Sequence, residues 1–100
     1  MNFTGKVRLI RKTDRKKNSE ITITEIVIET AETRPQFYIL TYFQREGKNF
    51  PDIAVNDIIY VTAELKGRQW IDPNSGEVSY FMSLLCSEIV IIKKGGNDEA

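Results

Sequence analysis

The sequence predicts an all-β domain, a small antiparallel barrel of five strands, and three observations lead to this prediction. β-Branched and aromatic residues gather in five segments, which polar stretches with glycine or proline separate. The segment 45–54, between the third and fourth of these, contains Gly47 and Pro51 and can hold at most one short helical turn. The apolar pattern of the second segment changes phase midway, which is typical of the bent strands that close small barrels.

Five strands and four connections account for most of the chain. We expect the strands at residues 3–12, 20–29, 36–44, 57–69 and 79–92. A polar loop, a turn that ends in a proline, the short linker and a dense turn signal connect them, at residues 13–19, 31–35, 45–54 and 72–76. The domain is therefore expected to span residues 1–93, and the polar tail 94–100 is expected to be disordered.

The first two strands follow from their alternation of side chains. In the first, Val7 and Leu9 are expected to face the core, with basic residues between them facing solvent. In the second, Ile23 lies on one face and Ile28 on the other. A single apolar strand shows such a shift when it contains an extra residue, so we expect a bulge near Thr24.

The third and fourth strands carry more large apolar groups than one core can hold. The third strand is apolar on both faces, whereas a strand of a small barrel buries only one. One face carries Phe37, Ile39 and Phe43, and the other carries Tyr38, Leu40 and Tyr42. In the fourth strand Ile59, Val61, Ala63 and Leu65 are expected to be buried, which leaves Ile58 and Tyr60 outside. These exposed groups indicate base stacking or contact with another subunit, unless a more covered barrel buries them all.

Strand number and connections select the fold. Five strands, a short turn or helical linker between the third and fourth strands, and a long terminal hairpin match the five-stranded Greek-key barrel of the OB-fold. An SH3-like barrel is the alternative, and the length of the last two strands favours the OB-fold.

The composition argues against an enzyme. The 100 residues include no His, which removes the commonest general base and metal ligand, and the single Cys86 excludes a disulfide framework. No phosphate-binding glycine loop and no nucleophile arrangement is evident, so we expect no catalytic residue, no metal and no cofactor. The sequence shows neither a signal peptide nor a membrane-spanning run, and we expect a cytoplasmic protein.

A net charge of zero conceals a basic segment. Residues 6–17 contain seven basic residues and one acid, so they could attract a polyanion although the whole chain is neutral. The residues expected to contact phosphates here are Arg11, Lys12, Arg15, Lys16 and Lys17. The alternative is a basic loop that is merely solvated.

Trp70 lies just before the turn at 72–76, near the tip of a hairpin, where it is poorly placed for the core. Lys66 and Arg68 precede it at alternating positions and therefore share its side of the strand. Cations in line with an aromatic ring are typical of proteins that follow a phosphate backbone while a ring stacks on a base. The alternative is a tryptophan folded back over the end of the barrel.

The segment 56–80 resembles the fourth strand and hairpin of the bacterial single-stranded DNA-binding protein family. It has an apolar strand, spaced basic residues, Trp70, an aspartate, a glycine turn and a tyrosine in the same order. The stretch from Phe37 to Phe43 is similar to the third strand of that family, and the resemblance extends more loosely over residues 3–92. It implies an OB-fold that binds single-stranded DNA and forms dimers or tetramers.

Roles follow from the matching positions of that family. Phe37, Phe43 and Trp70 match base-stacking aromatics; Lys66, Arg68 and Arg45 match cations that contact the backbone; Tyr60 matches a subunit contact, to which we add Ile58. The family's second-strand tryptophan, its longer helix and its acidic tail with an apolar tip are missing. Without that tail the resemblance gives no basis for expecting recruitment of replication proteins, and a small primosomal relative or an uncharacterised OB-fold relative of similar length matches these features better.

Three functions remain open from the sequence. The first is a single-stranded DNA-binding protein with little sequence preference, acting in replication, repair or recombination. The second is an oligomeric structural or protein-interaction domain, which the acidic excess outside the basic segment favours. The third is a single-stranded RNA binder, because the same stacking chemistry suits RNA.

Overall fold

The computed structural model describes residues 1–14, 21–45 and 49–95, apart from the side chains at positions 13, 14, 21 and 45. Five strands form one sheet: β1 (Asn2–Asp14), β2 (Ile21–Thr30), β3 (Phe37–Arg45), β4 (Ile58–Ile71) and β5 (Val78–Lys93). The sheet closes in the order β1-β2-β3-β5-β4, and every pair is antiparallel except β3 with β5. This all-β Greek-key barrel is the expected OB-fold, and no helix occurs among the described residues.

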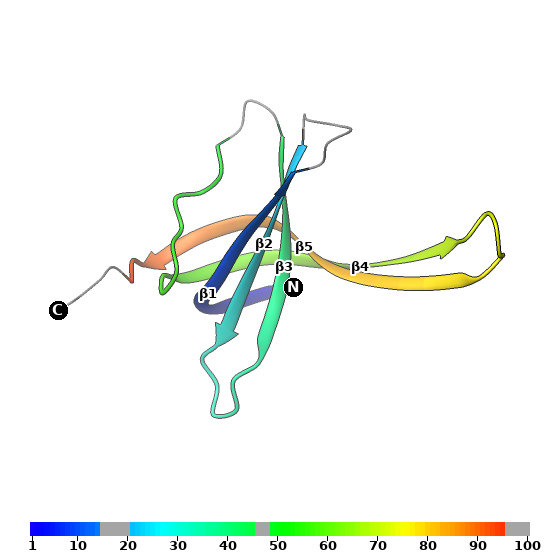
Figure 1. Ribbon diagram of the computed structural model, residues 1–100. Helices are drawn as coiled ribbons and strands as arrows, with labels where there is room; N and C mark the ends of the chain where they lie inside the picture. Colours follow the sequence, from blue (N-terminus) through cyan, green and yellow to red (C-terminus); the bar gives the residue numbers. More distant parts are fainter. Residues whose placement is uncertain (15–20, 46–48, 96–100) are drawn as a thin grey trace.

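The core lies between the two crossing halves of the barrel, where β1, β2 and β3 pass over β4 and β5 (Figure 1). Its buried side chains are apolar and come from every strand and from the linker after β3: Val7, Ile26, Ile28, Leu40, Ile53, Ile59, Val61, Ala63 and Cys86. Aromatic rings close the ends of this core, with the Phe3 and Tyr38 ring centroids 4.8 Å apart and those of Tyr42 and Phe50 5.4 Å apart. The even-numbered face of β3 is thus the inner one.

The prediction of a bulge near Thr24 is wrong. β2 keeps an unbroken register with β3 along its whole length, from Ile21 to Glu29. The irregularity lies instead in β1, whose register with β2 shifts between Val7 and Leu9. Leu9 is consequently exposed, contrary to the alternation that the sequence predicts. The sequence pattern of β2 was misleading because that strand carries apolar residues on both faces. The apolar residues of the two faces looked like those of a single face interrupted by a bulge.

Gly5 lies where β1 changes partner, pairing with Ile59 of β4 on one side and Thr30 of β2 on the other. A Cβ atom at this position would lie 2.8 Å from the backbone oxygen of Glu29. Only glycine therefore allows β1 and β2 to approach this closely at the point where the barrel closes.

Asp57 connects the start of β4 to the end of β5. Its carboxylate is fully buried and accepts hydrogen bonds from the Ala54 N–H, the Gly95 N–H and Lys94 Nζ, each at 2.8 Å. Burial by itself would raise the pKa of Asp57, but the bonds from Lys94, Gly95 and Ala54 outweigh it and lower the pKa below its usual value. Lys94 and Gly95 thus contact the barrel, and residues 96–100 of the expected tail lie outside the described residues.

β4 and β5 continue beyond the barrel as a two-stranded ribbon (Figure 1). We call its outer part, residues 66–83, the arm. The pairing of β4 with β5 continues without a break from the pair Lys66 and Ser83 to the pair Ile71 and Val78. The predicted turn closes the arm, and in it the Gly76 N–H donates a hydrogen bond to the backbone carbonyl oxygen of Asp72. Gly76 has a φ of 78°, a conformation that glycine adopts readily.

Candidate nucleic-acid interface

The outer face of the barrel consists of the odd-numbered residues of β2 and β3. Strand register places Leu9, Val27 and Ile39 in one row across β1, β2 and β3, and places Arg11, Glu25 and Thr41 in the next. Phe37 and Phe43 lie on β3 on either side of these rows, and they are 60% and 45% exposed. Both predicted stacking phenylalanines therefore remain in solvent, together with Ile39 between them.

The register also connects this outer face to the arm. β3 and β5 pair in parallel through Leu40 with Leu84 and through Thr41 with Leu85. Leu40 is buried and Leu84 packs against the core, so Thr41 and Leu85 face outward. Because Leu85 pairs in turn with Glu64 of β4, the outer face of β3 continues onto one face of the arm.

That face of the arm, the basic face, carries Lys66, Arg68 and Trp70 on β4 and Ser79, Phe81 and Ser83 on β5. Trp70 is 51% exposed and has not folded back over the barrel. Phe81 pairs directly with Arg68 and is also exposed, so it adds an aromatic ring that the sequence analysis missed. The turn at 72–76 fixes the hairpin register and could have placed Phe81 on this face.

The predicted basic residues differ in whether they have a partner within the chain. On the basic face, Lys66 Nζ lies 3.4 Å from Glu64 Oε2, whereas Arg68 has no ion pair among the described residues. On the barrel, Arg11 Nε donates a hydrogen bond to Glu25 Oε1, which lies 3.0 Å away. Lys12 lies on the other side of β1, with its Nζ 5.6 Å from the Phe50 ring centroid. Arg15, Lys16, Lys17 and the Arg45 side chain lie outside what the structure describes.

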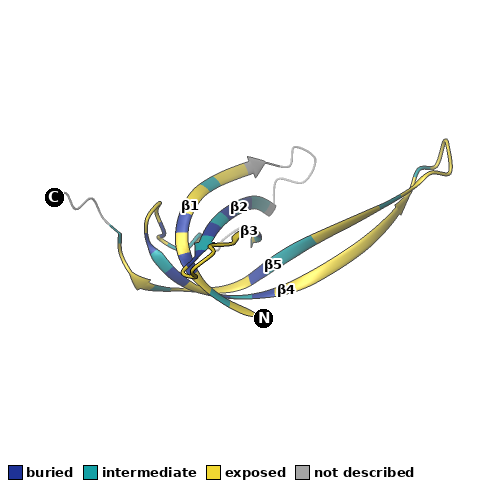
Figure 2. Ribbon diagram, turned by 90° about the horizontal axis from the view of Figure 1, so that it is seen from below, coloured by how far each residue is buried: buried dark blue, intermediate teal, exposed yellow. Residues whose placement is uncertain are grey.

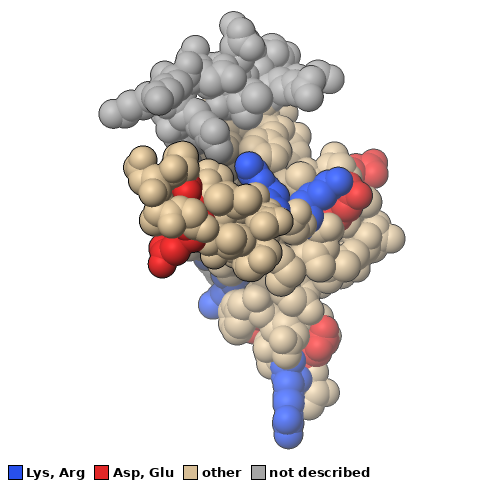
Figure 3. All heavy atoms as spheres, turned by 90° about the vertical axis from the view of Figure 1, so that its right-hand side faces the viewer, with Lys and Arg blue, Asp and Glu red and all other residues tan. Residues whose placement is uncertain are grey.

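Charge is dispersed on the side of the molecule toward which the arm points. In Figure 3 the basic side chains are separated by neutral surface, and acidic side chains lie close to them. The described surface on this side therefore offers separate cations with uncharged residues between them, not a continuous positive groove. Any polyanion bound here would depend strongly on the exposed rings.

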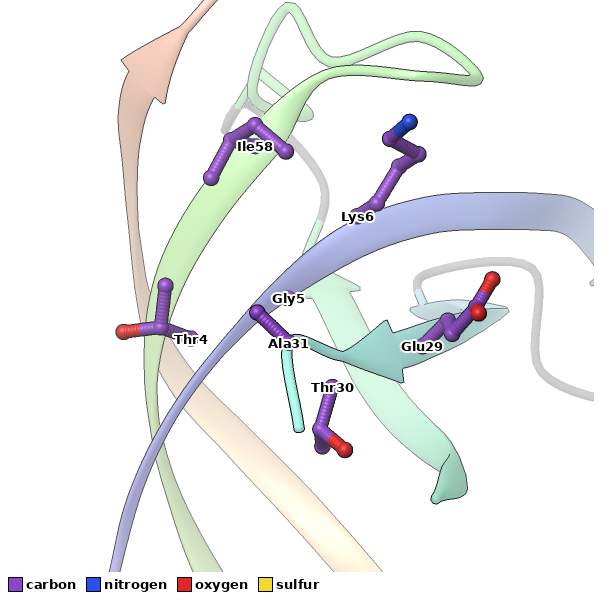
Figure 4. A pocket seen from close by; sticks show the side chains of 7 residues that line it. All are labelled: Thr4, Gly5, Lys6, Glu29, Thr30, Ala31 and Ile58. Carbon is purple, nitrogen blue, oxygen red and sulfur yellow. The ribbon is translucent and has the colours of Figure 1, made fainter. Parts of the chain in front are cut away.

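Ile58 and Tyr60, the predicted subunit contacts, lie on a different surface. Tyr60 pairs with Thr4 of β1 and Val90 of β5, and both Tyr60 and Val90 are exposed. Ile58 is half-buried and lines a pocket of about 250 Å³ where β1 changes partner, together with Lys6 and other residues (Figure 4). None of the predicted stacking aromatics lines this pocket.

Three further findings concern metal ligands, the single cysteine and membrane-spanning helices. Among residues 1–14, 21–45 and 49–95, no three potential metal ligands gather closely enough to hold a metal ion. Cys86 is buried, and this burial raises the pKa of its thiol to about 11. Within the same ranges no helix has the length and apolar character needed to cross a membrane.

Comparison with known proteins gives the fold and the family. The chain is similar to the mitochondrial single-stranded DNA-binding protein Rim1 of S. cerevisiae, in a crystal structure with a TM-score of 0.64, 16% identity and 95% of each chain covered. No protein of curated function matches the chain. The family model of a domain of unknown function, DUF3127, matches residues 2–89. The chain therefore belongs to the DUF3127 family.

Proposed function

We propose that this protein binds single-stranded DNA with little sequence preference, in replication, repair or recombination in the cytoplasm. The observation that carries the proposal is the continuous outer surface from β3 to the arm, on which Phe37, Phe43 and Trp70 stand in solvent. Any base offers a face to stack on, so exposed rings bind without selecting a sequence. The OB-fold that the chain shares with a single-stranded DNA-binding protein agrees with this role.

Cations complete the proposed interface. Lys66 and Arg68 lie in line with Trp70 and are placed to follow a phosphate backbone across the arm. Arg11 lies on the outer face of the barrel, where release from Glu25 would free it for a phosphate. Arg45, Lys12, Arg15, Lys16 and Lys17 remain proposed phosphate contacts. The proposal needs no catalytic group and no cofactor.

The experiment is a fluorescence titration of the full chain with dT and rU oligomers at low salt. Trp70 is the sole tryptophan, and a base stacked on it should quench its emission. We expect dT to quench, and a Phe43→Ala variant to bind about 1–3 kcal/mol more weakly, which is the usual contribution of one stacked base. An Ile39→Ala variant is the matched control, because this side chain lies on the same face of β3 but has no ring. Unchanged emission with both oligomers would contradict the proposal.

RNA binding and protein binding are the alternatives. Tighter binding of rU than of dT would favour RNA as the natural ligand. The exposed apolar patch at Tyr60 and Val90 favours the second alternative, an oligomeric interaction domain in which Ile58 and Tyr60 contact a neighbouring subunit. Light scattering with and without oligonucleotide separates these functions, because an interaction domain would show an oligomer and no shift on adding nucleic acid.

A further inference from the structure

The outer face of the barrel carries charges of opposite sign on neighbouring strands. The register places Glu25 of β2 beside Arg11 of β1. It places Glu29 of β2 between Lys6 of β1 and Phe37 of β3. β1 and β3 are two strand spacings, about 10 Å, apart. A strand that carries acids therefore separates the exposed rings of β3 from the basic residues of β1.

Each of these acids contacts an arginine of β1. Arg11 Nε donates a hydrogen bond to Glu25 Oε1 at 3.0 Å, and Arg8 Nε lies 3.4 Å from Glu29 Oε1. The side chains of the arginines are more exposed than those of their acidic partners. Figure 2 shows the same difference between the strands, because the described residues of β2 are buried or intermediate whereas β1 also carries exposed ones. A phosphate that approaches either arginine from solvent therefore meets a carboxylate beside it.

We propose that Glu25 and Glu29 restrict binding to nucleic acids whose bases are unstacked, an inference that rests on the proposed function. A ligand that offers only phosphates must displace an acid to bond Arg8 or Arg11, and the displaced carboxylate still repels it. A ligand with free bases can bind the uncharged rings of β3 instead. The two acids are thus specificity-determining residues that act against the wrong ligand.

Single strands and duplexes differ in whether they can avoid the acids. In a duplex the base faces are hidden, so only its phosphates are attracted to the outer face. The duplex is stiff, and its phosphates cannot approach the arginines of β1 without lying near Glu25 and Glu29. A flexible single strand can stack on Phe37 and Phe43 while its backbone follows the side of β3 that continues onto the arm. It therefore meets the acids less than a duplex does.

The experiment measures the affinity of the full chain for three probes at the same salt concentration. The probes are a dT oligomer, a duplex of equal length, and inorganic polyphosphate, which has no bases. We expect the unmodified chain to bind dT most tightly. Replacing both Glu25 and Glu29 with Gln should tighten the binding of duplex and polyphosphate by about 2- to 25-fold, because each exposed ion pair contributes a factor of about 1.4 to 5. The affinity for dT should rise by a smaller factor.

Two further variants identify the cause of this gain. Glu88→Gln is the matched control for a single replacement, since it removes the same charge from β5, where Glu88 has no ion pair among the described residues. It should leave the ratio of the dT and duplex affinities unchanged. Adding Arg11→Gln to Glu25→Gln should cancel the gain in duplex affinity, because that gain depends on the freed arginine.

The outcomes separate this inference from the proposed function. Unchanged duplex and polyphosphate affinities, equal gains for dT and duplex, or a gain that survives Arg11→Gln would each overturn the inference. Glu→Gln variants that only lose stability in circular dichroism would do the same, since the ion pairs would then serve the sheet alone. An unmodified chain that does not bind dT would instead contradict the proposed function, and the polyphosphate series would still show whether the acids withhold Arg8 and Arg11.

Discussion

Phe37 and Phe43 lie on the same side of β3, and Ile39 and Thr41 lie between them. Six residues of strand span about 20 Å, so the two rings are too far apart to stack on adjacent bases of one strand. A bound chain would therefore cross apolar surface between two stacking positions. Such spacing makes contact with bases intermittent, and this agrees with low sequence preference.

Asp57 gives a pH prediction at the scale of one residue. Its folded pKa lies below the usual value of 3.8 because of the bonds from Lys94, Gly95 and Ala54. A lowered folded pKa means that the stabilisation is complete above the unfolded pKa, about 3.9, and is lost as the pH falls through the folded pKa. We expect the free energy of unfolding to decrease as the pH falls below about 4, as urea denaturation at several pH values would show.

An Asp57→Asn variant serves as the comparison for this prediction. Asparagine has nearly the same size but no titrating carboxyl, so part of the decrease should disappear. The variant should also be less stable than the unmodified chain at pH 7, because the ion pair with Lys94 is lost. Equal acid sensitivity of the two proteins would show that Asp57 does not contribute.

Gly5 gives a prediction at the scale of β1. Gly5→Ala would place a Cβ 2.8 Å from the Glu29 backbone oxygen, and backbone atoms cannot move aside cheaply. We expect a loss of about 1–3 kcal/mol in the free energy of unfolding, the usual cost of overpacking. Gly67→Ala is the control in dilute protein, because its Cβ would meet no described atom. A Gly5→Ala protein as stable as the original would mean that β1 and β2 can separate here.

The elements themselves were largely predictable. The strand segments and the turn at 72–76 follow from alternation and turn chemistry, and each predicted strand overlaps an observed one. The bulge was not predictable, because the pattern of β1 around Arg8 alternates normally and only the shifted pairing of Val7 and Leu9 with β2 reveals it. A bulge depends on the partner strand, which a single segment does not contain.

The candidate interface was predictable residue by residue but not as a surface. The exposure of Phe37, Phe43 and Trp70 follows from an excess of apolar residues and from position in a hairpin. Their common surface depends on the two parallel pairs between β3 and β5, which no local pattern indicates. The role of Asp57 was missed for a related reason, since its partner Lys94 is 37 residues away.

At the largest scale, the separation of basic side chains on the described surface in Figure 3 predicts weak electrostatic binding on that side of the molecule. Each phosphate neutralised on a single strand contributes about 0.7 to the slope of log affinity against log salt. Replacing both Lys66 and Arg68 with Gln should therefore lower the slope by about 1.4, as titrations at several salt concentrations would measure. Lys93→Gln is the control, because Lys93 pairs with Ile58 at the far end of β4. An unchanged slope in the double variant would remove the arm from the phosphate path.

The position of Trp70 on the arm also determines what its spectrum can report during denaturation. It is the chain's sole indole and is half in solvent, about 40 Å along β4 from the start of that strand at Ile58. Its emission will therefore follow fraying of the ribbon, whereas melting of the buried aliphatic layer needs a backbone probe such as far-ultraviolet dichroism. Midpoints that differ between the two signals would then show that the arm frays before the barrel unfolds.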